Sequence, residues 1–432
     1  MVRKLTAAAA AALATLTASC APPSQPPVKV RALVLSSNGE YTPTEVELKT
    51  ITDIVAMEGQ VMKVVGGSHI RLDSQDPELN AAQGKGDEAY LRAVLKDAGR
   101  PVTASYITDE KGVLWPADFH TWNLVTTYYN LERARDYFIN SAEVKVAELP
   151  QTTTYYFPEF VLADSSDAPL VDNAIFFSPV QAFLVLPFQK IEKAPMALNA
   201  SILTHEYAHL VFNRRVYEGR GVPVPIQSWS LDGSTPGLNA IKALDEGLAD
   251  FHAYVASCQT SYNCNPRVLY TTLEGPQAEA RDLSKKWCMG TELKQQLLAA
   301  NFGQFTEGQY LVGTIMASAL YESASTSPAW RQVLARAVVA AYSDLDTVKP
   351  GLAQLAKTYT TDQSGFTLAR ALRSIIQHIP NGEVDLKNRV CSNLATRLRF
   401  TDKEIAELTG APLSGPNDCP QTPTINDCSI AP

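Results

Sequence analysis

The stretch that decides the fold prediction is residues 202–210, which read Ile-Leu-Thr-His-Glu-Tyr-Ala-His-Leu. This is the pattern H-E-x-x-H within an apolar run. Because His205 and His209 are four residues apart, a helix places both imidazoles on one face, where they can bind one metal ion. Zn²⁺ binds imidazole nitrogen well, and a catalytic zinc keeps one coordination position for water. Glu206 stands beside that position, so its carboxylate is a candidate base.

A second stretch supplies the other groups that such a site needs. Glu246 and Asp250 are again four residues apart, within Ala-Leu-Asp-Glu-Gly-Leu-Ala-Asp at 243–250. Glu246 can complete a His-His-Glu ligand set, and Asp250 can accept a hydrogen bond from the ring N–H of a liganding histidine. H-E-x-x-H alone also arises by chance on a polar helix face, and the second pair favours the metal site. His252 points away from the ligand face and is expected to be structural.

Together these stretches resemble the gluzincin zinc peptidases, above all the thermolysin-like group, which carries H-E-x-x-H and then N-E-x-x-x-D on the next long helix. Asp-Phe-His-Thr-Trp at 118–122 is similar to the D-x-H-aromatic helix before the active site of that group. Asn-Ala-Ile-Phe at 173–176 is similar to its edge strand, which pairs with extended peptide substrate; Asn173 and Ala174 would lie on it. The resemblance covers roughly residues 113–325.

The resemblance implies an α+β fold of two lobes, with a strand-bearing N-terminal half, an α-helical C-terminal half and the zinc cleft between them. It implies hydrolysis of peptide bonds at a Zn²⁺ ion held by His205, His209 and Glu246. Glu206 would be the general base and would then carry the proton towards the leaving amine. Asp250 would orient His205.

The sequence departs from the pattern of that group at several positions. Asp245 precedes the ligand glutamate where asparagine is usual, and its carboxylate either orients His209 or caps a turn. Tyr310 stands where the group has the histidine that donates to the transition-state oxyanion, so it is either the donor here or a core residue. The second donor of the group, a tyrosine, has no counterpart in residues 226–239. These departures concern rate and substrate rather than metal binding.

Two alternatives to a peptidase stay open. One is a zinc-containing surface lipoprotein that is catalytically weak or inactive and binds a partner, which the missing donors favour. The retained Glu206 argues against it, because a structural zinc site needs no base. The other alternative keeps the same chemistry and cleaves a different amide bond. The oligomeric state is also left open.

Composition indicates an acidic globular protein. The chain has 432 residues, of which 45% are hydrophobic and 19% charged, and a formal net charge of −8. It can therefore bury a large core and is not expected to be disordered. The sequence contains no long basic run, so a nucleic-acid partner is not expected. It also contains no G-x-S-x-G elbow, so a serine hydrolase is not indicated. The expected partner is a peptide or protein substrate.

The first residues predict export. A short basic start precedes an apolar, alanine-rich run at 5–16, and Thr-Ala-Ser-Cys follows at 17–20. This is typical of a signal peptide, here over residues 1–19. The ending resembles a bacterial lipobox, in which Cys20 becomes the first residue and is acylated. We expect a membrane-anchored lipoprotein, periplasmic or at the cell surface; free secretion is the alternative, because threonine stands where leucine is commonest.

Seven cysteines leave an even number once Cys20 is set aside. The other six all follow Glu246, and none forms a C-x-x-C pair. Disulfides in an oxidising compartment are therefore expected in the C-terminal half, rather than a cysteine metal site. Their pairing is left open. They are Cys258, Cys264, Cys288, Cys391, Cys419 and Cys428.

Hydrophobic periodicity and turn residues divide the chain further. A tether at 20–27 leads to an N-terminal lobe at 28–218, a helical lobe at 219–410 and a Pro-rich tail at 411–432, which only its two cysteines would hold. Strands are expected at 28–35, 152–163 and 173–188, and helices at 118–140, 197–215, 238–258, 310–323, 329–342, 352–359, 366–378 and 387–399.

Two capping boxes mark further helix starts. Thr-Pro-Thr-Glu at 42–45 predicts a helix after the first strand, with proline at the first helical position. Thr-Asp-Lys-Glu at 401–404 predicts a last short helix that ends at Gly410. The Gly- and Pro-rich loop at 219–237 separates the two helices of the site, and is either a substrate contact or a plain connector.

Overall fold

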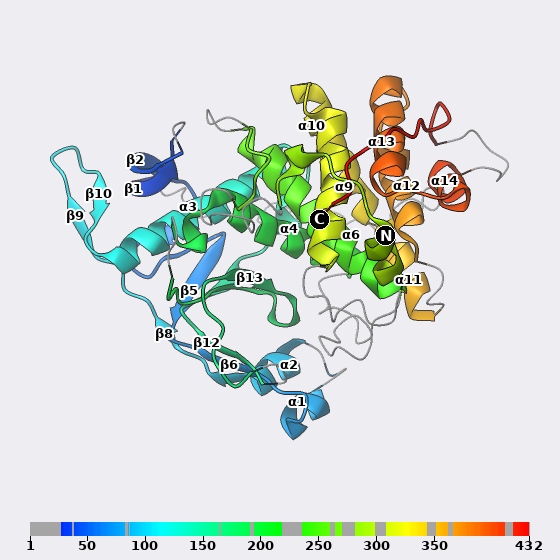
Figure 1. Cartoon of the computed structure of the whole chain (residues 1–432). Helices are drawn as coiled ribbons and strands as arrows, with labels where there is room; N and C mark the ends of the chain where they lie inside the picture. The colour runs from blue at the N-terminus through cyan, green and yellow to red at the C-terminus, as the bar shows by residue number, and fades with distance from the viewer. Residues whose placement is uncertain are drawn as a thin grey trace, which may run out of the picture.

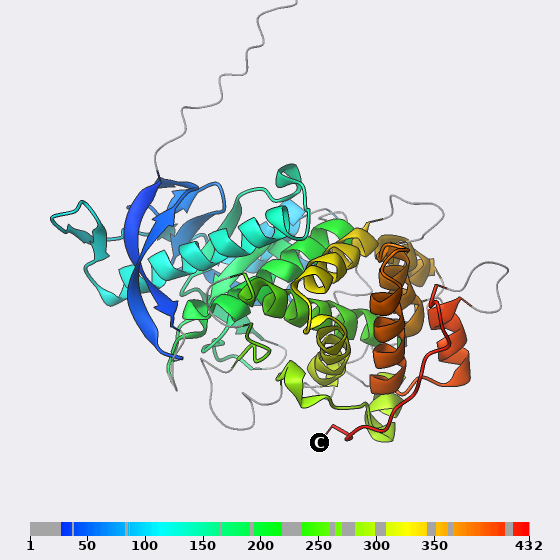
Figure 2. The same cartoon turned by 90° about the horizontal axis from the view of Figure 1, so that it is seen from above.

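The N-terminal half of the chain is rich in strands and the C-terminal half is helical, so the fold is α+β, as the sequence predicts (Figure 1). In this computed structural model, α4 (Ala200–Val216) and α6 (Pro236–Ser257) lie between the strands and the later helices (Figure 2). The signal segment, Cys20 and most of the 219–237 loop lie outside the described residues. The structure describes residues 27–431 except 37–38, 83–84, 86, 164–165, 191–193, 218–235, 260–263, 270–280, 299–307, 344–350, 362–365 and 411–417.

A seven-stranded sheet forms the wall beside the candidate site. Its strand order is β13-β14-β11-β5-β4-β3, with β8 paired to β5. β11 runs parallel to both β14 and β5, whereas β13 lies at the end of the sheet, antiparallel to β14. One edge of β13 is therefore open to α4. The strands are β3 (Ile51–Asp53), β4 (Glu58–Gly59), β5 (Met62–Gly66), β8 (Arg100–Pro101), β11 (Thr152–Tyr156), β13 (Ala174–Phe177) and β14 (Ala182–Val185).

Two predicted strands are each divided in the structure. The 152–163 segment breaks at Phe157, whose backbone is left-handed with a φ of 53°, and its second part joins a different sheet. The 173–188 segment folds back between β13 and β14 through a short 3-10 helix, η2 (Ser178–Val180), and the left-handed Gln181. Neither turn contains the glycine that usually marks a left-handed residue, but each contains a proline, Pro158 or Pro179, which is a turn signal in the sequence.

Two smaller sheets complete the strand-bearing half. One has the order β2-β1-β10-β9 and the other β12-β6-β7. Their strands are β1 (Val28–Leu35), β2 (Tyr41–Leu48), β9 (Tyr106–Thr108), β10 (Leu114–Pro116), β6 (His69–Leu72), β7 (Leu95–Asp97) and β12 (Glu159–Leu162).

The helix predicted from the capping box at 42–45 is wrong, because these residues lie within β2. That strand pairs antiparallel with β1 along its whole length. Val46 and Leu48 are buried while Glu45 and Glu47 are exposed, which is the period of a strand. The local capping pattern is outweighed by this cross-strand pairing. Pro43 is tolerated because β2 is the edge strand of its sheet.

Helices cover both faces of the large sheet. α3 (Phe119–Asn140) and α4 pack on one face, and α1 (Pro77–Ala82) and α2 (Asp87–Val94) are associated with the other. Neighbouring strand residues face opposite layers. In β11, for example, Tyr155 belongs to the core with α2, and Tyr156 to the core with α3 and α4.

α6 is the central helix of the second half and packs on α4 and on α9 (Gly308–Ala324). It approaches α9 closely where Gly247 faces Gly313, because a Cβ added to Gly313 would lie 2.8 Å from the Gly247 nitrogen. The same Cβ would lie 3.1 Å from the Cβ of Glu246. The glycine pair therefore lets the beginning of α9 pass directly beside the predicted ligand.

The remaining helices follow the prediction closely, apart from a short α8. The capping box at 401–404 opens α14, and Gly410 ends it in a left-handed conformation, as the sequence predicts. The helices are α8 (Thr291–Leu297), α10 (Pro328–Tyr342), α11 (Leu352–Thr361), α12 (Leu368–His378), α13 (Val384–Arg397) and α14 (Asp402–Thr409), with 3-10 turns η1 (Val146–Glu148), η3 (Met196–Leu198) and η5 (Leu283–Lys285).

Disulfides hold the second half together. The pairs are Cys258–Cys264, Cys288–Cys428 and Cys391–Cys419, so the expected oxidised state of these six cysteines is confirmed. Such bonds are consistent with an exported protein. The Cys288–Cys428 bond links residues 140 apart in sequence, and a disulfide that closes a longer loop restricts the unfolded chain more. No described helix is long and apolar enough to cross a membrane.

The C-terminal tail is held by more than its two cysteines, which corrects the prediction. Asp418 accepts hydrogen bonds from Arg373 Nε at 2.5 Å and from Gln377 Nε2 at 3.0 Å. The Cys288 N–H also donates to the Ser429 carbonyl at 2.7 Å. These polar contacts cannot be read from the sequence because their partners lie far apart along the chain.

Replacing Gly313 by alanine should loosen the contact between α6 and α9. The new Cβ would lie 2.8 Å from the Gly247 nitrogen and 2.9 Å from the Ala243 carbonyl oxygen, so the helices must move apart. We expect the free energy of unfolding, measured in urea, to fall by about 1–3 kcal/mol. Gly382→Ala is the control, because nothing lies within 4 Å of its new Cβ. Equal stability of the two variants would contradict the packing described here.

Candidate metal centre

Helix α4 carries both histidines of the H-E-x-x-H pattern. Asn199 caps this helix, since its Oδ1 accepts hydrogen bonds from the N–H groups of Ser201 at 2.8 Å and Ile202 at 3.2 Å. One helical turn places the rings together, with His205 Nε2 and His209 Nε2 only 2.9 Å apart. Both rings therefore direct the same nitrogen to one point.

Glu246 on α6 brings a carboxylate to that point. Its Oε2 lies 3.2 Å from His205 Nε2 and 3.7 Å from His209 Nε2. This oxygen is buried and accepts no hydrogen bond within the described part of the chain, although buried polar atoms normally do. The three ligand atoms lie within 4.8 Å of one another, and this group could hold a metal ion.

Carboxylates also hold the far nitrogens of both rings. Asp250 Oδ1 lies 3.0 Å from His205 Nδ1, and Asp245 Oδ1 lies 2.8 Å from His209 Nδ1. A proton on His209 Nδ1 leaves the lone pair of its Nε2 free for a metal. His205 Nδ1 also lies 3.1 Å from Arg281 Nη2, so a donor and the Asp250 acceptor both face this nitrogen. Asp245 lies inside α6, so the alternative in which it caps a turn is excluded.

Arg281 is a further residue of the centre, and sequence reasoning missed it. Its guanidinium donates to Asp250 through Nη2 at 2.5 Å and Nε at 3.1 Å, and Nη2 lies 3.5 Å from Glu246 Oε2. Burial alone would raise the pKa of Asp250, but Arg281 and His205 lower it to about 2. Arg281 belongs to no motif and follows the second site helix at no regular spacing, so no signal in the sequence marks it.

The charges of the centre favour a cation. Four carboxylates, those of Glu206, Asp245, Glu246 and Asp250, lie beside the two imidazoles. Arg281 contacts two of them, Glu246 and Asp250. Imidazoles bind a metal only in their neutral form, so the two histidines add no positive charge to a metal site. A divalent cation would bring these buried charges closer to balance, and unbalanced buried charge is costly.

Glu206 lies between the ligand cluster and the open edge of β13. Its Oε2 accepts a hydrogen bond of 2.6 Å from the Phe176 N–H, and its Oε1 lies 4.0 Å from His205 Nε2. Burial raises the pKa of Glu206, while the two histidines and the Phe176 N–H act in the opposite direction. The carboxylate is thus fixed at one oxygen and faces the cluster with the other.

The structure places Asn173 and Ala174 at the start of this edge strand. Ala174 pairs with Val185 of β14. In an antiparallel ladder, the backbone N–H and C=O groups of residues two apart point to the same edge of the strand. Since the Phe176 N–H points to α4, the backbone groups of Ala174 also point away from β14. The Asn173 side chain accepts a hydrogen bond of 2.8 Å from the Ala174 N–H, which leaves the Ala174 carbonyl as the outward acceptor.

Tyr310 lies in the first turn of α9, beside Arg281. The guanidinium carbon of Arg281 is 5.1 Å from the centre of the Tyr310 ring. The charge of Glu246 and burial raise the pKa of Tyr310, so its hydroxyl keeps its proton at neutral pH. The hydroxyl is therefore a potential donor near the cluster, but no hydrogen bond joins it to His205 or Glu246 in the described structure.

The D-x-H pattern at 118–122 does not reach the centre. His120 Nδ1 lies 2.8 Å from the Tyr156 hydroxyl, and Asp118 caps α3 by accepting a hydrogen bond of 2.9 Å from the Thr121 N–H. These residues fix the beginning of a core helix. His252 is also separate from the cluster, because its Nδ1 lies 2.7 Å from the Tyr137 hydroxyl among buried aromatic rings.

Comparison with known proteins does not assign this chain to a family. No protein-family model matches the sequence, and no curated protein matches it. Function is therefore inferred from the geometry of the centre and from the resemblance of its motifs.

Replacing Glu246 by alanine should remove most of the bound zinc. The wild-type chain should retain a single Zn²⁺ after dialysis, measured by plasma mass spectrometry, because two imidazoles and this carboxylate converge on one point. Asp250→Ala should weaken zinc affinity by about 10–100-fold, since it frees the His205 ring. Glu143→Ala, at an exposed position, is the control. Full zinc content in Glu246→Ala would disprove the ligand assignment.

Acid should destabilise the fold through His252. The unfolded chain has an ordinary histidine pKa of about 6.5, whereas burial lowers the pKa of His252 in the folded protein to about 3. As the pH falls below the unfolded value, protons therefore bind the unfolded chain preferentially and stability is lost.

Urea unfolding at two pH values tests this effect. Between about pH 7 and pH 5, the wild-type protein should lose about 2 kcal/mol more stability than His252→Gln. His69→Gln, on the half-buried strand β6, is the control and should follow the wild type. The same pH dependence in wild type and His252→Gln would show that the buried ring has an ordinary pKa.

Proposed function

We propose that this protein is a zinc-dependent peptidase that hydrolyses peptide bonds outside the cytoplasm. The observation that carries the proposal is the position of Glu206. Its carboxylate is buried beside a His-His-Glu cluster and bound to a sheet edge at Phe176. A structural metal site needs its ligands and no further carboxylate at this place, whereas water-dependent hydrolysis needs a base there.

The donor set fits zinc. Two imidazole nitrogens and one carboxylate oxygen are a common ligand set of catalytic Zn²⁺. The Glu246 Oε2 that faces both imidazoles accepts no hydrogen bond in the described part of the chain, and its distance to Arg281 Nη2 is 3.5 Å, so its lone pairs are available to a metal. When bound, Zn²⁺ would acidify water and polarise the substrate carbonyl.

Glu206 would accept the proton of the attacking water and pass it to the leaving amine, which departs well only when protonated. Its raised pKa suits this role, because a base works best with a pKa near the working pH. The Phe176 N–H holds Oε2, so that Oε1 is the oxygen directed to the cluster. A single carboxylate can then serve both proton transfers.

The substrate proposed is an extended peptide along β13. An open sheet edge binds a peptide through backbone hydrogen bonds, and the Ala174 carbonyl is the outward acceptor nearest the start of this edge. Arg281 and Tyr310 are the candidate donors to the oxyanion that forms in hydrolysis. Arg281 is already fixed by two hydrogen bonds to Asp250, so it would act as a preorganised group.

The position of the centre is compatible with the two-lobed, thermolysin-like arrangement that the motifs imply. α4 packs against the edge strand of the large sheet and against α6 of the helical half. The ligands thus come from the two helices at which the halves meet. A metal-containing binding lipoprotein is the second candidate, favoured by the lack of a hydrogen bond from Tyr310 to the cluster.

Glu206→Gln should separate the two candidates. The amide keeps the size of the side chain and can still accept from Phe176, so zinc content and Tm should stay close to those of the wild type. Turnover should fall by about 10²–10⁴-fold or more, because the base is lost. The measurement is digestion of a proteome-derived peptide library, read by mass spectrometry, with Glu143→Gln as a control of unchanged activity.

Tyr310→Phe should cost no more than about 10²–10³-fold, the loss expected for one oxyanion donor. If zinc-loaded wild-type protein cleaves nothing in the library, or if Glu206→Gln cleaves equally well, the peptidase proposal fails. The binding lipoprotein then takes its place.

The proposed location is the outside of a bacterial membrane, with a lipid anchor at Cys20. The disulfides of the second half support export, and the lipobox-like ending at residues 17–20 supports the anchor. Expressed in a bacterial host, the mature protein should begin with an acylated Cys20, measured by mass spectrometry of the N-terminal peptide, and Cys20→Ser should remove it from the membrane fraction. A mature chain that begins at another residue would rule out the anchor.

A further inference from the structure

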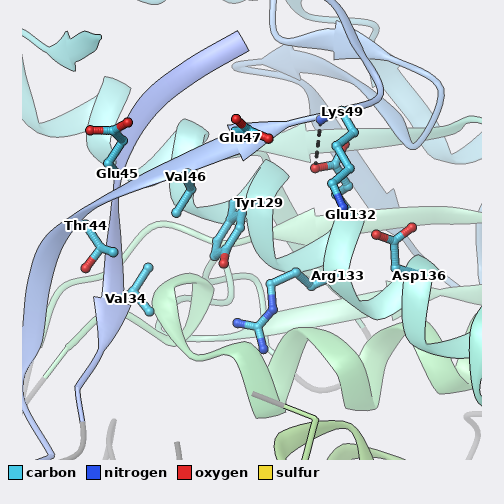
Figure 3. A pocket seen from close by; sticks show the side chains of 10 residues that line it. All are labelled: Val34, Thr44, Glu45, Val46, Glu47, Lys49, Tyr129, Glu132, Arg133 and Asp136. Atoms are coloured by element: carbon cyan, nitrogen blue, oxygen red, sulfur yellow. Dashed lines mark hydrogen bonds between the residues drawn. The ribbon is translucent and has the colours of Figure 1, made fainter. Parts of the chain in front are cut away.

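A groove outside the metal centre lies along the free edge of β2. Its volume is about 470 Å³, and its walls come from this strand and from α3 (Figure 3). Among the described strands, β2 is the end strand of its four-stranded sheet, so one side of its backbone meets no other strand. The strand contributes residues 44–47 to the groove, and the helix contributes Tyr129, Glu132, Arg133 and Asp136.

Hydrogen bonds around β2 show which of its backbone groups face outward. In an antiparallel pair, residues that bond to the partner strand alternate with residues whose N–H and C=O groups point away from it. The Ser36 N–H donates to the Glu40 carbonyl at 2.8 Å, at the end of the ladder between β1 and β2. The Leu33 N–H points away from β2 and donates to the Thr126 hydroxyl at 3.0 Å. The even-numbered residues of β2 therefore bond to β1, and the odd-numbered residues face outward.

Two of the outward-facing residues offer a complete set of backbone groups. Pro43 has no N–H, and the Lys49 N–H just beyond the strand donates to Glu132 of α3 at 3.2 Å. Glu45 and Glu47 lie between these positions and are exposed. No hydrogen bond from the described part of the chain reaches their outward N–H and C=O groups. These two donors and two acceptors can pair with a further strand.

The side chains of β2 determine which strand fits there. Glu45 and Glu47 point to the outer face of the sheet, whereas Val46 points to the side of Tyr129 and α3 (Figure 3). Glu45 faces Arg31 of β1 at 3.7 Å, but Glu47 forms no ion pair with a residue that the structure describes. An added strand would therefore meet negative charge on one face and apolar surface on the other.

The strand that the chain itself places on the other side of β2 has the matching pattern. In β1, the basic residues Lys29 and Arg31 alternate with apolar residues. Lys29 lies opposite Glu47, and Arg31 lies opposite Glu45. Opposite charges across a strand pair stabilise a sheet, and like charges destabilise it. The free edge presents the same two glutamates, so it favours the same alternation and disfavours neutral or acidic strands.

We infer that the free edge of β2 binds an extended peptide segment in which basic and apolar residues alternate. The segment runs antiparallel to β2, with basic residues opposite Glu45 and Glu47. The apolar residue between them packs against Val46 and Tyr129. The backbone of the segment bonds to the outward groups of the two glutamates, as peptides do when they extend a sheet. This surface is separate from β13, and its binding does not depend on peptidase activity.

The test uses the full chain carrying Glu206→Gln, so that no peptidase activity can consume the probe. The probe is acetyl-Thr-Lys-Val-Lys-Val-Thr-amide, and its binding is measured by titration calorimetry. We expect a Kd on the order of 100 µM, since a short segment forms few hydrogen bonds.

Two matched peptides separate backbone pairing from charge. N-methylation of both lysine residues removes the two N–H groups that face β2 and keeps both side-chain charges. It should weaken binding by about tenfold or more, because two hydrogen bonds are lost. A peptide with glutamate in place of both lysines should bind severalfold more weakly, because like charges then oppose Glu45 and Glu47.

Substitutions in β2 locate the site in the same background. Glu47→Pro removes an outward N–H without removing a bond to β1, as Pro43 already does on this edge, so the Tm should stay close to that of the parent protein. Binding of the probe should fall by about tenfold or more. Glu47→Lys should weaken it severalfold, because the charge is reversed. Glu110→Gln, at an exposed position between β9 and β10, is the control and should bind the probe unchanged.

Four results would overturn the inference. The first is no heat from the probe at about 1 mM, where a Kd on the order of 100 µM gives near-saturation. The second is equal binding of the methylated peptide, which tests the backbone contact without altering the protein. The third is unchanged binding by Glu47→Lys and Glu47→Pro, which would place the peptide elsewhere. The fourth is self-association of the parent protein that Glu47→Pro abolishes in sedimentation, which would assign the edge to a second copy of the chain.

Discussion

The burial of charge where α4 meets α6 is the constraint on which the rest of this structure depends. Ionised carboxylates and guanidinium groups are costly to bury unless they are paired and hydrogen-bonded. The helices can come together only because each imidazole nitrogen faces a carboxylate and because Arg281 neutralises Asp250. Gly247 and Gly313 add to this by allowing α9 to approach Glu246 closely enough to cover it.

A comparison within the molecule shows why a cation fits this place. Glu132 is also a buried carboxylate, and the protein satisfies it with hydrogen bonds from the Thr50 N–H at 2.6 Å and the Thr50 hydroxyl at 2.5 Å. The Lys49 N–H donates a third, at 3.2 Å (Figure 3). Glu246 Oε2 is also buried, but it accepts no hydrogen bond in the described structure. It faces two imidazole nitrogens instead, so a metal ion is the partner that the surroundings can accommodate.

The sequence predicts much of this centre, because its ligands repeat at helical spacing. His205 and His209, and then Glu246 and Asp250, are four residues apart, and such spacing fixes a common face before any tertiary contact is known. The long apolar helices and the capping box at 401–404 are likewise predicted from residues that lie close together in the sequence. The even count of cysteines also predicts their oxidation, though not their partners.

What the sequence does not predict depends on contacts between distant segments. Arg281 has no motif, and only the folded chain brings it to Asp250. The edge position of β13 follows from the order of the strands in the sheet, which is not a local property. The capping box at 42–45 is the opposite case, because a strong local signal gives way to the pairing of β2 with β1. Local rules fail here where a cross-strand ladder offers more hydrogen bonds than a helix start.

The most direct measurement is X-ray absorption spectroscopy at the zinc edge of the wild-type protein loaded with one equivalent of Zn²⁺. If the ion binds where α4 meets α6, its first coordination shell should contain two imidazole nitrogens at about 2.0–2.1 Å and carboxylate oxygen at about 2.0–2.2 Å, without sulfur. A shell of water oxygens alone, or one that contains sulfur, would contradict the account, because the ion would then lie away from His205, His209 and Glu246.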